Sequence, residues 1–325
     1  MISIKLKNKK ENIEKIFWDW FYKYHLKEFL EILSNDVVLQ NLIFGHEGKY
    51  LIWENDIYKY KKNDYAVLKK FFFSSPEEHF KYCKKMKKKN MKINNDSETF
   101  FYHRYENFRK TQIPKIIEIL GIHTCPYCNR NFIDVYYDKK STKPNKFNGD
   151  IDHYFPKSKY SYLALCLYNL IPSCKTCNHE KADLDKINFQ PFHPYMDDDS
   201  TYRFKTDFDL ESEITDFDYL YGLSEKFNIK ISDYLGGNKA NSIEESISTF
   251  HLDDKYKNMT LFAKNIIRKA YIYNNDYLKD FISQCKNILT KEEVIKILFD
   301  YDGENFLDKP LSKFKSDLMK EFDVI

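Results

Sequence analysis

The 325-residue sequence has no long hydrophobic run, and no stretch reaches the length of a membrane-spanning helix. Its first residues, MISIKLKNKKENIEKIFWDWF, lack the uninterrupted apolar core of a signal peptide. Glycine is scarce, and no phosphate loop is present, because GHEGKY at residues 45–50 has neither the spacing nor the hydroxyl residue of one. We therefore expect a cytoplasmic protein without a membrane partner, in which any nucleotide hydrolysis comes from another chain.

An overall excess of one charge is also absent, since the formal net charge of +3 identifies no partner. The distribution of charge is uneven, however. Seven lysines and no acid fall within residues 81–92, and nine acids against two basic residues fall within residues 197–218. A basic segment attracts phosphate, although a solvated helix face is the alternative. For the acidic segment we expect a solvated surface, with a partner-facing or site-shielding surface as the alternative.

What the sequence does contain is a set of paired cysteines. Cys125 and Cys128 lie in CPYCNRNF, and Cys174 and Cys177 lie in CKTC. In a cytosolic chain disulfides are rare, and paired cysteines usually bind metal. Four thiolates fill the tetrahedral shell of a zinc ion and leave no position for water, so we predict a structural zinc site. The alternative, a redox dithiol, suits CPYC but does not account for the second pair.

Apolar residues repeat at helical spacing on both sides of these pairs, over residues 13–24, 113–120 and 259–273. The segments FIDVYY, IDHYF and NLIPSC read as extended, and KTCNHEKADLDKI reads as helical. We therefore predict an α+β fold, a predominantly helical chain around a small zinc-stapled module. The predicted parts are a helical region at 1–115 that contains the basic segment 81–92, the four-cysteine zinc module at 116–190 and a helical domain at 191–325.

Polar residues that could carry chemistry lie between and after the cysteine pairs. GDIDHYFPKSKY holds Asp152 and His153, YNLIPSC holds Asn169, and CNHEK holds Asn178 and Lys181. A strand would point Asp152 and His153 to opposite faces unless a turn brought both to one rim. A helix would place Asn178 and Lys181 on one face, because they are three residues apart. Each of these residues alone is ordinary.

Together, the pattern C-x-x-C … D-H … N-L … C-x-x-C-N-x-x-K resembles the HNH nuclease family, whose fold is the ββα-metal motif. The resemblance implies that Asp152 is a metal ligand and that His153 is the general base. Asn169 would brace the loop and orient the base. Asn178, at a position that is often His in the family, would be the second protein ligand, and Lys181 would contact phosphate.

The resemblance covers residues 125–183 and implies an endonuclease that hydrolyses phosphodiester bonds in nucleic acid, with DNA expected ahead of RNA. A neutral imidazole accepts a proton from water near pH 7, and a hard cation held by oxygen ligands neutralises the departing oxygen. Mg²⁺ suits those ligands best, and Mn²⁺ is the expected substitute. The alternative function is a catalytically inactive zinc-stapled module that binds nucleic acid or protein.

A wider resemblance is carried by CPYCNRNFI, DIDHYFPKSKY and KPLSKFKSDLMKEF. These segments look like those of bacterial HNH proteins that accompany a separate ATPase in anti-phage systems, of which the Septu type is the best known. The resemblance implies an effector nuclease in antiviral defence, regulated by that ATPase. Of the other residues near the motif, Asp150 could assist Asp152, His123 and His179 could touch zinc or substrate, and His193 is expected to be a loop residue.

Overall fold

The structure is a computed structural model that describes most of the chain. The described residues are 1–44, 65–138, 146–184, 191–208, 217–233, 240–284, 288–301, 303 and 305–325. The GHEGKY segment at 45–50 and the middle of the acidic segment, at 209–216, lie outside them. The described chain is mixed α and β and mostly helical, which confirms the predicted fold class at that level. None of its described helices is long and apolar enough to cross a membrane.

The chain forms two compact units, and neither is one continuous stretch of sequence. The N-terminal unit comprises Ser3–Ile122 and Ile133–Asp197. The C-terminal unit comprises Met1–Ile2, His123–Phe132 and Asp198–Ile325. The predicted domain boundaries at residues 115 and 190 stay a prediction. Each compact unit joins residues from more than one of the three predicted parts.

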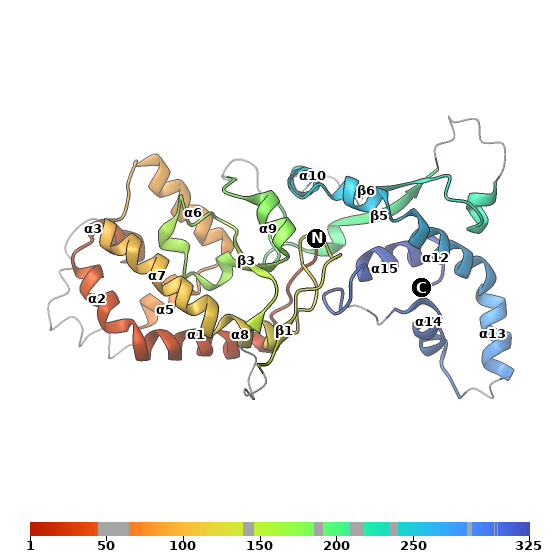
Figure 1. Cartoon of the computed structure of the whole chain (residues 1–325), viewed down its shortest axis with the longest axis horizontal. Helices are drawn as coiled ribbons and strands as arrows, with labels where there is room; N and C mark the ends of the chain where they lie inside the picture. The colour runs from red at the N-terminus through yellow and green to blue at the C-terminus, as the bar shows by residue number, and fades with distance from the viewer. Residues whose placement is uncertain are drawn as a thin grey trace. The chain divides into compact units, whose positions relative to one another are not determined.

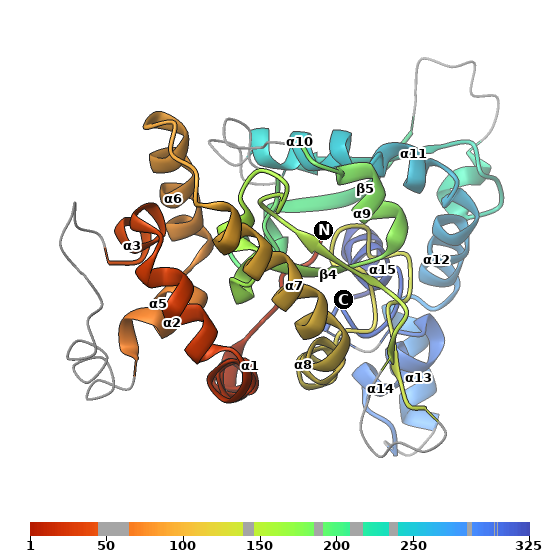
Figure 2. The same ribbon diagram turned by 60° about the vertical axis from the view of Figure 1, so that its left-hand side comes forward.

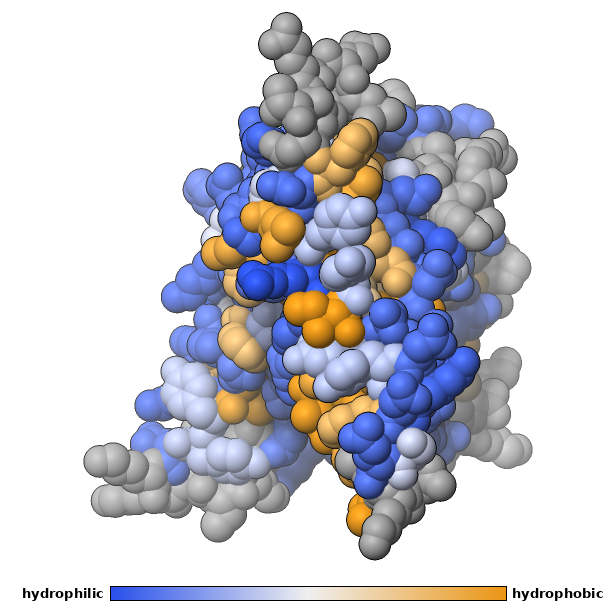
Figure 3. Space-filling view, turned by 90° about the vertical axis from the view of Figure 1, so that its right-hand side faces the viewer, coloured by the Kyte–Doolittle hydropathy of each residue, from blue (hydrophilic) through white to orange (hydrophobic). Residues whose placement is uncertain are grey.

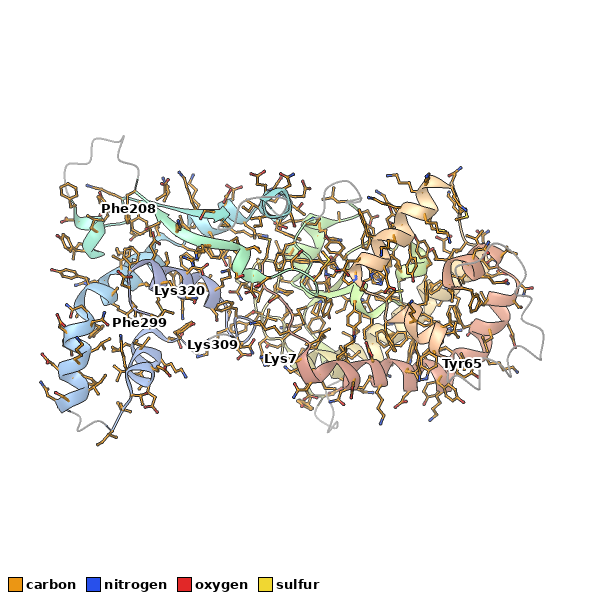
Figure 4. The ribbon with its side chains drawn as sticks, turned by 180° about the vertical axis from the view of Figure 1, so that it is seen from behind. Lys7, Tyr65, Phe208, Phe299, Lys309 and Lys320 are labelled. Atoms are coloured by element: carbon orange, nitrogen blue, oxygen red, sulfur yellow. The ribbon has the colours of Figure 1, made fainter. Side chains whose placement is uncertain are left out.

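Helices make up most of the N-terminal unit (Figure 1). Aromatic side chains are prominent in its core. Phe17 lies against Phe72 and Phe108, with ring centroids 5.4 and 5.1 Å away, and all three rings are fully buried. Of the periodic residues in 13–24, most are therefore core, whereas Ile16 is half-buried and Tyr24 at the helix end is exposed. Tyr65, labelled in Figure 4, immediately precedes the helix that carries Phe72. The helices are α1 (Lys10–Tyr24), α2 (Leu26–Ser34), α3 (Val37–Phe44), α5 (Ala66–Phe72), α6 (Pro76–Lys88), α7 (Asn95–Thr111) and α8 (Ile113–Leu120).

Helix α6 carries most of the lysine-rich segment 81–92. Ser75 caps its first turn through a capping box with Glu78, which fixes where the helix begins. Six of the seven lysines are exposed, while Lys85 is half-buried and donates to the carbonyl of Asn41 at 3.3 Å. The segment therefore presents a strongly basic surface on the N-terminal unit.

Helix α8 ends where the sequence predicts, at Gly121. This residue has φ 60° and ψ 47°, a left-handed conformation that a side chain with Cβ disfavours. Lys9 donates from Nζ to the last helical carbonyl, that of Leu120, at 2.8 Å. The apolar face of the helix is buried as expected, through Ile113, Ile116, Ile117 and Leu120.

The predicted strands form short antiparallel ribbons. β3 (Asp150–His153) pairs with β4 (Leu170–Ser173) in the register Asp152 to Ile171, and α9 (Lys175–Lys181) follows β4 directly. Helices α7 and α9 both lie beside this ribbon (Figure 2). Of FIDVYY, only β1 (Val135–Tyr136) is strand, paired with β2 (Lys146–Phe147). The order strand, strand, helix is the order of a ββα unit.

The C-terminal unit contains a ribbon that the helical prediction for 191–325 missed. β5 (Tyr202–Asp207) pairs with β6 (Asn228–Asp233), and buried and exposed residues alternate along β5 as a half-buried strand requires. Around it lie α10 (Ala240–Thr249), α11 (Leu252–Lys257), α12 (Thr260–Ile272), α13 (Asn275–Gln284), α14 (Lys291–Phe299) and α15 (Ser312–Glu321).

Two regions of this unit contrast in burial. Tyr256 packs against Phe204 and Phe314 in the core, with ring centroids 4.3 and 5.5 Å away. By contrast, Leu261 and Phe262 of α12 are exposed. Figure 3 shows that apolar residues also lie on the surface of the molecule. The periodicity of residues 259–273 therefore predicted the helix correctly, but Phe262 does not belong to its buried stripe.

Candidate active site and metal centre

The first cysteine pair lies in a tight turn. Cys125 donates from its backbone N–H to the carbonyl of Asn131 at 3.0 Å, and Asn129 donates to the carbonyl of Cys125 at 2.7 Å. Asn129 has φ 49°, in the left-handed region that asparagine tolerates better than most residues. Between the cysteines, the ring of Tyr127 is buried and stacks on Phe250 at 4.3 Å. The turn thus holds both thiols in a fixed place.

The second pair begins helix α9. Cys174 is the N-cap residue, with an extended backbone, and its Sγ accepts from the N–H of Cys177 at 3.5 Å. A side chain that satisfies an N–H of the first helical turn marks the start of a helix. The helix therefore starts immediately after β4, and both thiols sit at this junction.

The four sulfur atoms form one cluster. The Sγ atoms of Cys125, Cys128, Cys174 and Cys177 all lie within 4.8 Å of one another, and all four residues are buried. Four sulfurs at about 2.3 Å from one zinc ion would lie roughly 3.8 Å apart, so this group can hold a metal ion such as zinc. The prediction of a four-cysteine metal site is confirmed at that level. The predicted minor candidates His123 and His179 have exposed side chains and do not belong to the cluster.

Asp152 and His153 end strand β3, and both are nearly buried, with 3% and 7% of their surfaces exposed. Both line a pocket of about 290 Å³. Adjacent residues of a strand ordinarily point to opposite faces. Here the strand ends at His153, and both residues belong to the lining of the same pocket.

The imidazole of His153 is oriented by its surroundings. Its Nε2 lies 3.2 Å from the carbonyl oxygen of Ala164, and its ring meets that of Tyr105 edge-on at 4.4 Å. With the proton on Nε2, that nitrogen donates to Ala164, and Nδ1 carries the lone pair. Burial, assisted by the charge of Lys157, lowers the pKa of His153 to about 3, so the ring is neutral at pH 7.

Lys181 has a different environment from the one expected. Its side chain is fully buried, and Nζ lies 2.9 Å from Oδ1 of Asp152 and 2.7 Å from the carbonyl oxygen of His153. A buried ammonium group in this position cannot reach a phosphate that stays in solvent. In this structure Lys181 therefore supports the strand end, whereas its contact with phosphate stays a prediction. It holds the end of β3 through Asp152 and His153.

Asn169 is fully buried and braces the segment that follows β3. Its amide nitrogen donates to the carbonyls of Phe155 and Leu163, both at 3.1 Å, and its amide oxygen accepts from the N–H of Phe155 at 2.8 Å. Since Leu163 immediately precedes Ala164, this network also sets the carbonyl that faces His153. Asn169 does not line the pocket, so its place suits orientation rather than contact with a substrate.

Asn178 lies on the first turns of α9 and lines the pocket from that side. Its amide nitrogen donates to Oδ2 of Asp150 at 3.2 Å, and Arg109 of α7 lies 3.4 Å from Oδ1 of the same carboxylate. Asp150 is thus part of the pocket wall, beside Asp152. The other minor candidate, His193, lies in a loop as expected, but it is buried and packs on Tyr154 at 4.1 Å.

Residues outside the motif complete the pocket, and sequence reasoning missed most of them. Helix α7 contributes Tyr105, Glu106 and Arg109, and the turn after β3 contributes Lys157. Lys157 places its ammonium 4.5 Å from the ring centroid of Tyr105. Tyr105 and Arg109 are four residues apart and so share a helix face, but nothing in the sequence of α7 indicates that this face meets β3.

Comparison with known proteins adds a partial similarity. The chain is 33% identical over 82 residues to "Protein ea31" of Escherichia phage lambda. The matched stretch covers 24% of this chain and 23% of the phage protein, so each is matched over only about a quarter of its length. No family model and no solved structure matches.

Proposed function

We propose that this protein is a metal-dependent nuclease of the HNH type that hydrolyses phosphodiester bonds in nucleic acid. The observation that carries the proposal is that Asp152, His153 and Asn178 line one pocket on a strand–strand–helix unit. Cys177, next to Asn178, belongs to the four-cysteine cluster, so a metal in that cluster would steady the helix that presents Asn178. A purely structural module would not need Asp152, His153 and Asn178 to line one pocket.

His153 is the proposed general base. Its Nε2–H donates to Ala164, which leaves Nδ1 to accept a proton from water. That water forms a bond to phosphorus as the bond between phosphorus and the 3′ oxygen breaks, and the 3′ oxygen takes up a proton from solvent. Asn169 keeps the Ala164 carbonyl in place through the adjacent Leu163, so loss of Asn169 would misdirect the base rather than remove it.

The oxygen ligands at the pocket suit a hard cation. Asp150, Asp152 and Asn178 bring carboxylate and amide groups to it, and Mg²⁺ typically binds through one or two carboxylates while keeping several waters. When bound, Mg²⁺ or Mn²⁺ would supply positive charge against the departing oxygen. Lys181 also contacts Asp152 through Oδ1, at 2.9 Å.

Two cations of the protein are suited to the substrate phosphate. Arg109 and Lys157 line the pocket and are each partly exposed, with 40% and 31% of their side-chain surfaces accessible. An arginine fork and a lysine ammonium group are the usual protein partners of phosphate oxygens. They take over the phosphate contact that the sequence assigned to Lys181.

A nicking assay on supercoiled plasmid in Mg²⁺ tests the proposal. His153→Ala should lower the cleavage rate by about 10²–10⁴-fold, because a general base contributes that much. His103→Ala, which changes an exposed histidine of α7 that does not line the pocket, should cleave like wild type. Both variants should keep wild-type zinc content. Near wild-type cleavage by His153→Ala would overturn the assignment.

The alternative function is a zinc-stapled module that binds nucleic acid or protein without cutting it. One observation favours it, since the ammonium of Lys181 already neutralises Asp152, as in a structural ion pair. Under this alternative, neither Mg²⁺ nor Mn²⁺ would elicit cleavage from the wild-type protein. We further propose, from the wider sequence resemblance, that the nuclease acts in anti-phage defence with a partner ATPase. Co-purification with an ATPase encoded beside it would test that role.

A further inference from the structure

A second pocket, of about 440 Å³, lies in the N-terminal unit next to the candidate active site. The turn after β3 separates the two. Pro156 and Lys157 line the first pocket, and the following residues, from Ser158 onward, line the second. Because neighbouring Cα atoms are about 3.8 Å apart, Lys157 of the first pocket and Ser158 of the second are adjacent in space.

The lining of the second pocket combines exposed cations with a buried apolar part. Lys87, Lys92 and Lys159 are exposed, and they come from α6, from the segment between α6 and α7, and from the turn. Met86 and Tyr162 are 5% and 3% exposed and line the same cavity. Lysines suit phosphate, whereas a thioether and an aromatic ring suit the flat face of a nucleobase.

Polar groups between these two parts match the edge of a base. Asn90, Asn95 and Ser158 line the pocket with exposed amide and hydroxyl groups, and Glu98 adds an acceptor. Asn90 has φ 48°, so the chain turns sharply there between α6 and α7. The volume falls within the range of about 300–1,000 Å³ that is typical of small-ligand sites.

The turn between the pockets is firmly held. The N–H groups of Lys159 and Tyr160 both donate to the carbonyl of Pro156, at 3.0 and 2.9 Å. The hydroxyl of Tyr102 donates to the carbonyl of Lys157 at 3.0 Å, which ties the turn to α7. The backbone at Lys157, beside the first pocket, and at Lys159, beside the second, is therefore held in place, which suits contacts to successive phosphates of one strand.

We propose that the second pocket binds one nucleotide unit, with the base in the apolar part and the phosphate at the lysines. In a bound nucleic acid this unit flanks the phosphate held in the first pocket, and this placement rests on the proposed nuclease function. A free mononucleotide has the same chemistry. The two sources are distinguished by measuring binding of a nucleic-acid strand and of a mononucleotide separately.

The test measures binding without Mg²⁺ or Mn²⁺, so that cleavage does not enter. Fluorescence anisotropy with a labelled single-stranded DNA compares the full-length wild type with Lys92→Gln/Lys159→Gln. Affinity should fall by about 10-fold or more, since two charged contacts are lost. The slope of log affinity against log salt should become shallower by about 1.4, or about 0.7 for each phosphate contact. The control Lys27→Gln/Lys110→Gln removes equal charge from exposed residues that line neither pocket and should bind within about 2-fold of wild type.

A second pocket variant, Asn95→Trp, places a large side chain in the pocket from its exposed wall. Binding of AMP to the wild type and to both pocket variants is measured by calorimetric titration. Circular dichroism and thermal melting confirm that each variant is folded. Weaker strand binding by both pocket variants supports a strand nucleotide, whereas loss of AMP binding alone supports a free nucleotide. Wild-type binding of both probes by both pocket variants would overturn the proposal. If the pocket variants bind more weakly as expected but the wild-type protein does not nick plasmid, the nuclease function is refuted. The proposal of a nucleotide-binding pocket is then still supported.

Discussion

The buried ion pair between Lys181 and Asp152 offers a direct test of how the site is built. Both side chains are almost completely enclosed, with 0% and 4% of their surfaces exposed. Replacing Lys181 with methionine keeps much of the side-chain volume but removes the charge. Asp152 then stays buried without its cation, and the carbonyl of His153 loses its 2.7 Å donor. We therefore expect Lys181→Met to destabilise the fold through the groups left behind.

The size of the effect follows from the burial. Removing one partner of a buried ion pair costs about 3–5 kcal/mol, because the remaining charge is uncompensated. That is a large part of the total stability of about 5–15 kcal/mol of a typical domain. The double variant Lys181→Met/Asp152→Leu should recover most of the loss, since an apolar pair of similar volume replaces the charged one. Lys146→Met breaks an exposed pair with Asp138 and should change stability by no more than about 1 kcal/mol.

Urea unfolding followed by fluorescence measures these differences, with zinc content determined for each protein. Added Mg²⁺ should stabilise Lys181→Met more than wild type, because a cation can then replace the missing ammonium at Asp152. The reasoning is refuted if Lys181→Met unfolds within about 1 kcal/mol of wild type, or if the double variant is no more stable than the single one.

Three further predictions concern the two metals and acid stability. Cys174→Ser should lower zinc content below one ion per chain and lower the melting temperature, because structural zinc contributes on the order of 10 kcal/mol to small modules; a folded wild-type protein free of zinc in elemental analysis would contradict this. Asn178→Ala should raise the Mg²⁺ concentration needed for half-maximal nicking at unchanged zinc content, and superimposable Mg²⁺ titrations would contradict it. Burial lowers the pKa of His79 to about 3 from an ordinary 6.5. As pH drops, His79 is therefore protonated at a higher pH in the unfolded chain than in the folded one. The free energy of unfolding falls between pH 6.5 and 3 by about 1.4 kcal/mol per pH unit for this residue. His79→Phe should show a smaller loss of unfolding free energy between pH 7.5 and 5.5, and an unchanged loss would exclude His79 as a source.

Local patterns were enough to predict the elements of the site. The spacing of two cysteines is a short-range property, and a turn or a helix start brings such a pair together without help from the rest of the chain. Strand β3, strand β4 and helix α9 follow from runs of a few residues in the same way. Asp152 and His153 were chosen as candidates because they stand together in one of those runs. The aromatic spacing of α1 identified its buried face for the same reason.

Packing between distant segments decided what those local patterns could not. The apolar periodicity of a helix predicts which of its residues are buried, but not which element they pack against. The position of α7, which brings Tyr105 and Arg109 to the pocket beside β3, therefore could not be predicted. Likewise, three-residue spacing put Lys181 on a helix face, while the neighbouring ribbon turned that face into the interior and paired it with Asp152. A charge that reads as a surface contact in the sequence thus became a buried support, because burial depends on what covers a residue, and the covering residues lie elsewhere in the chain.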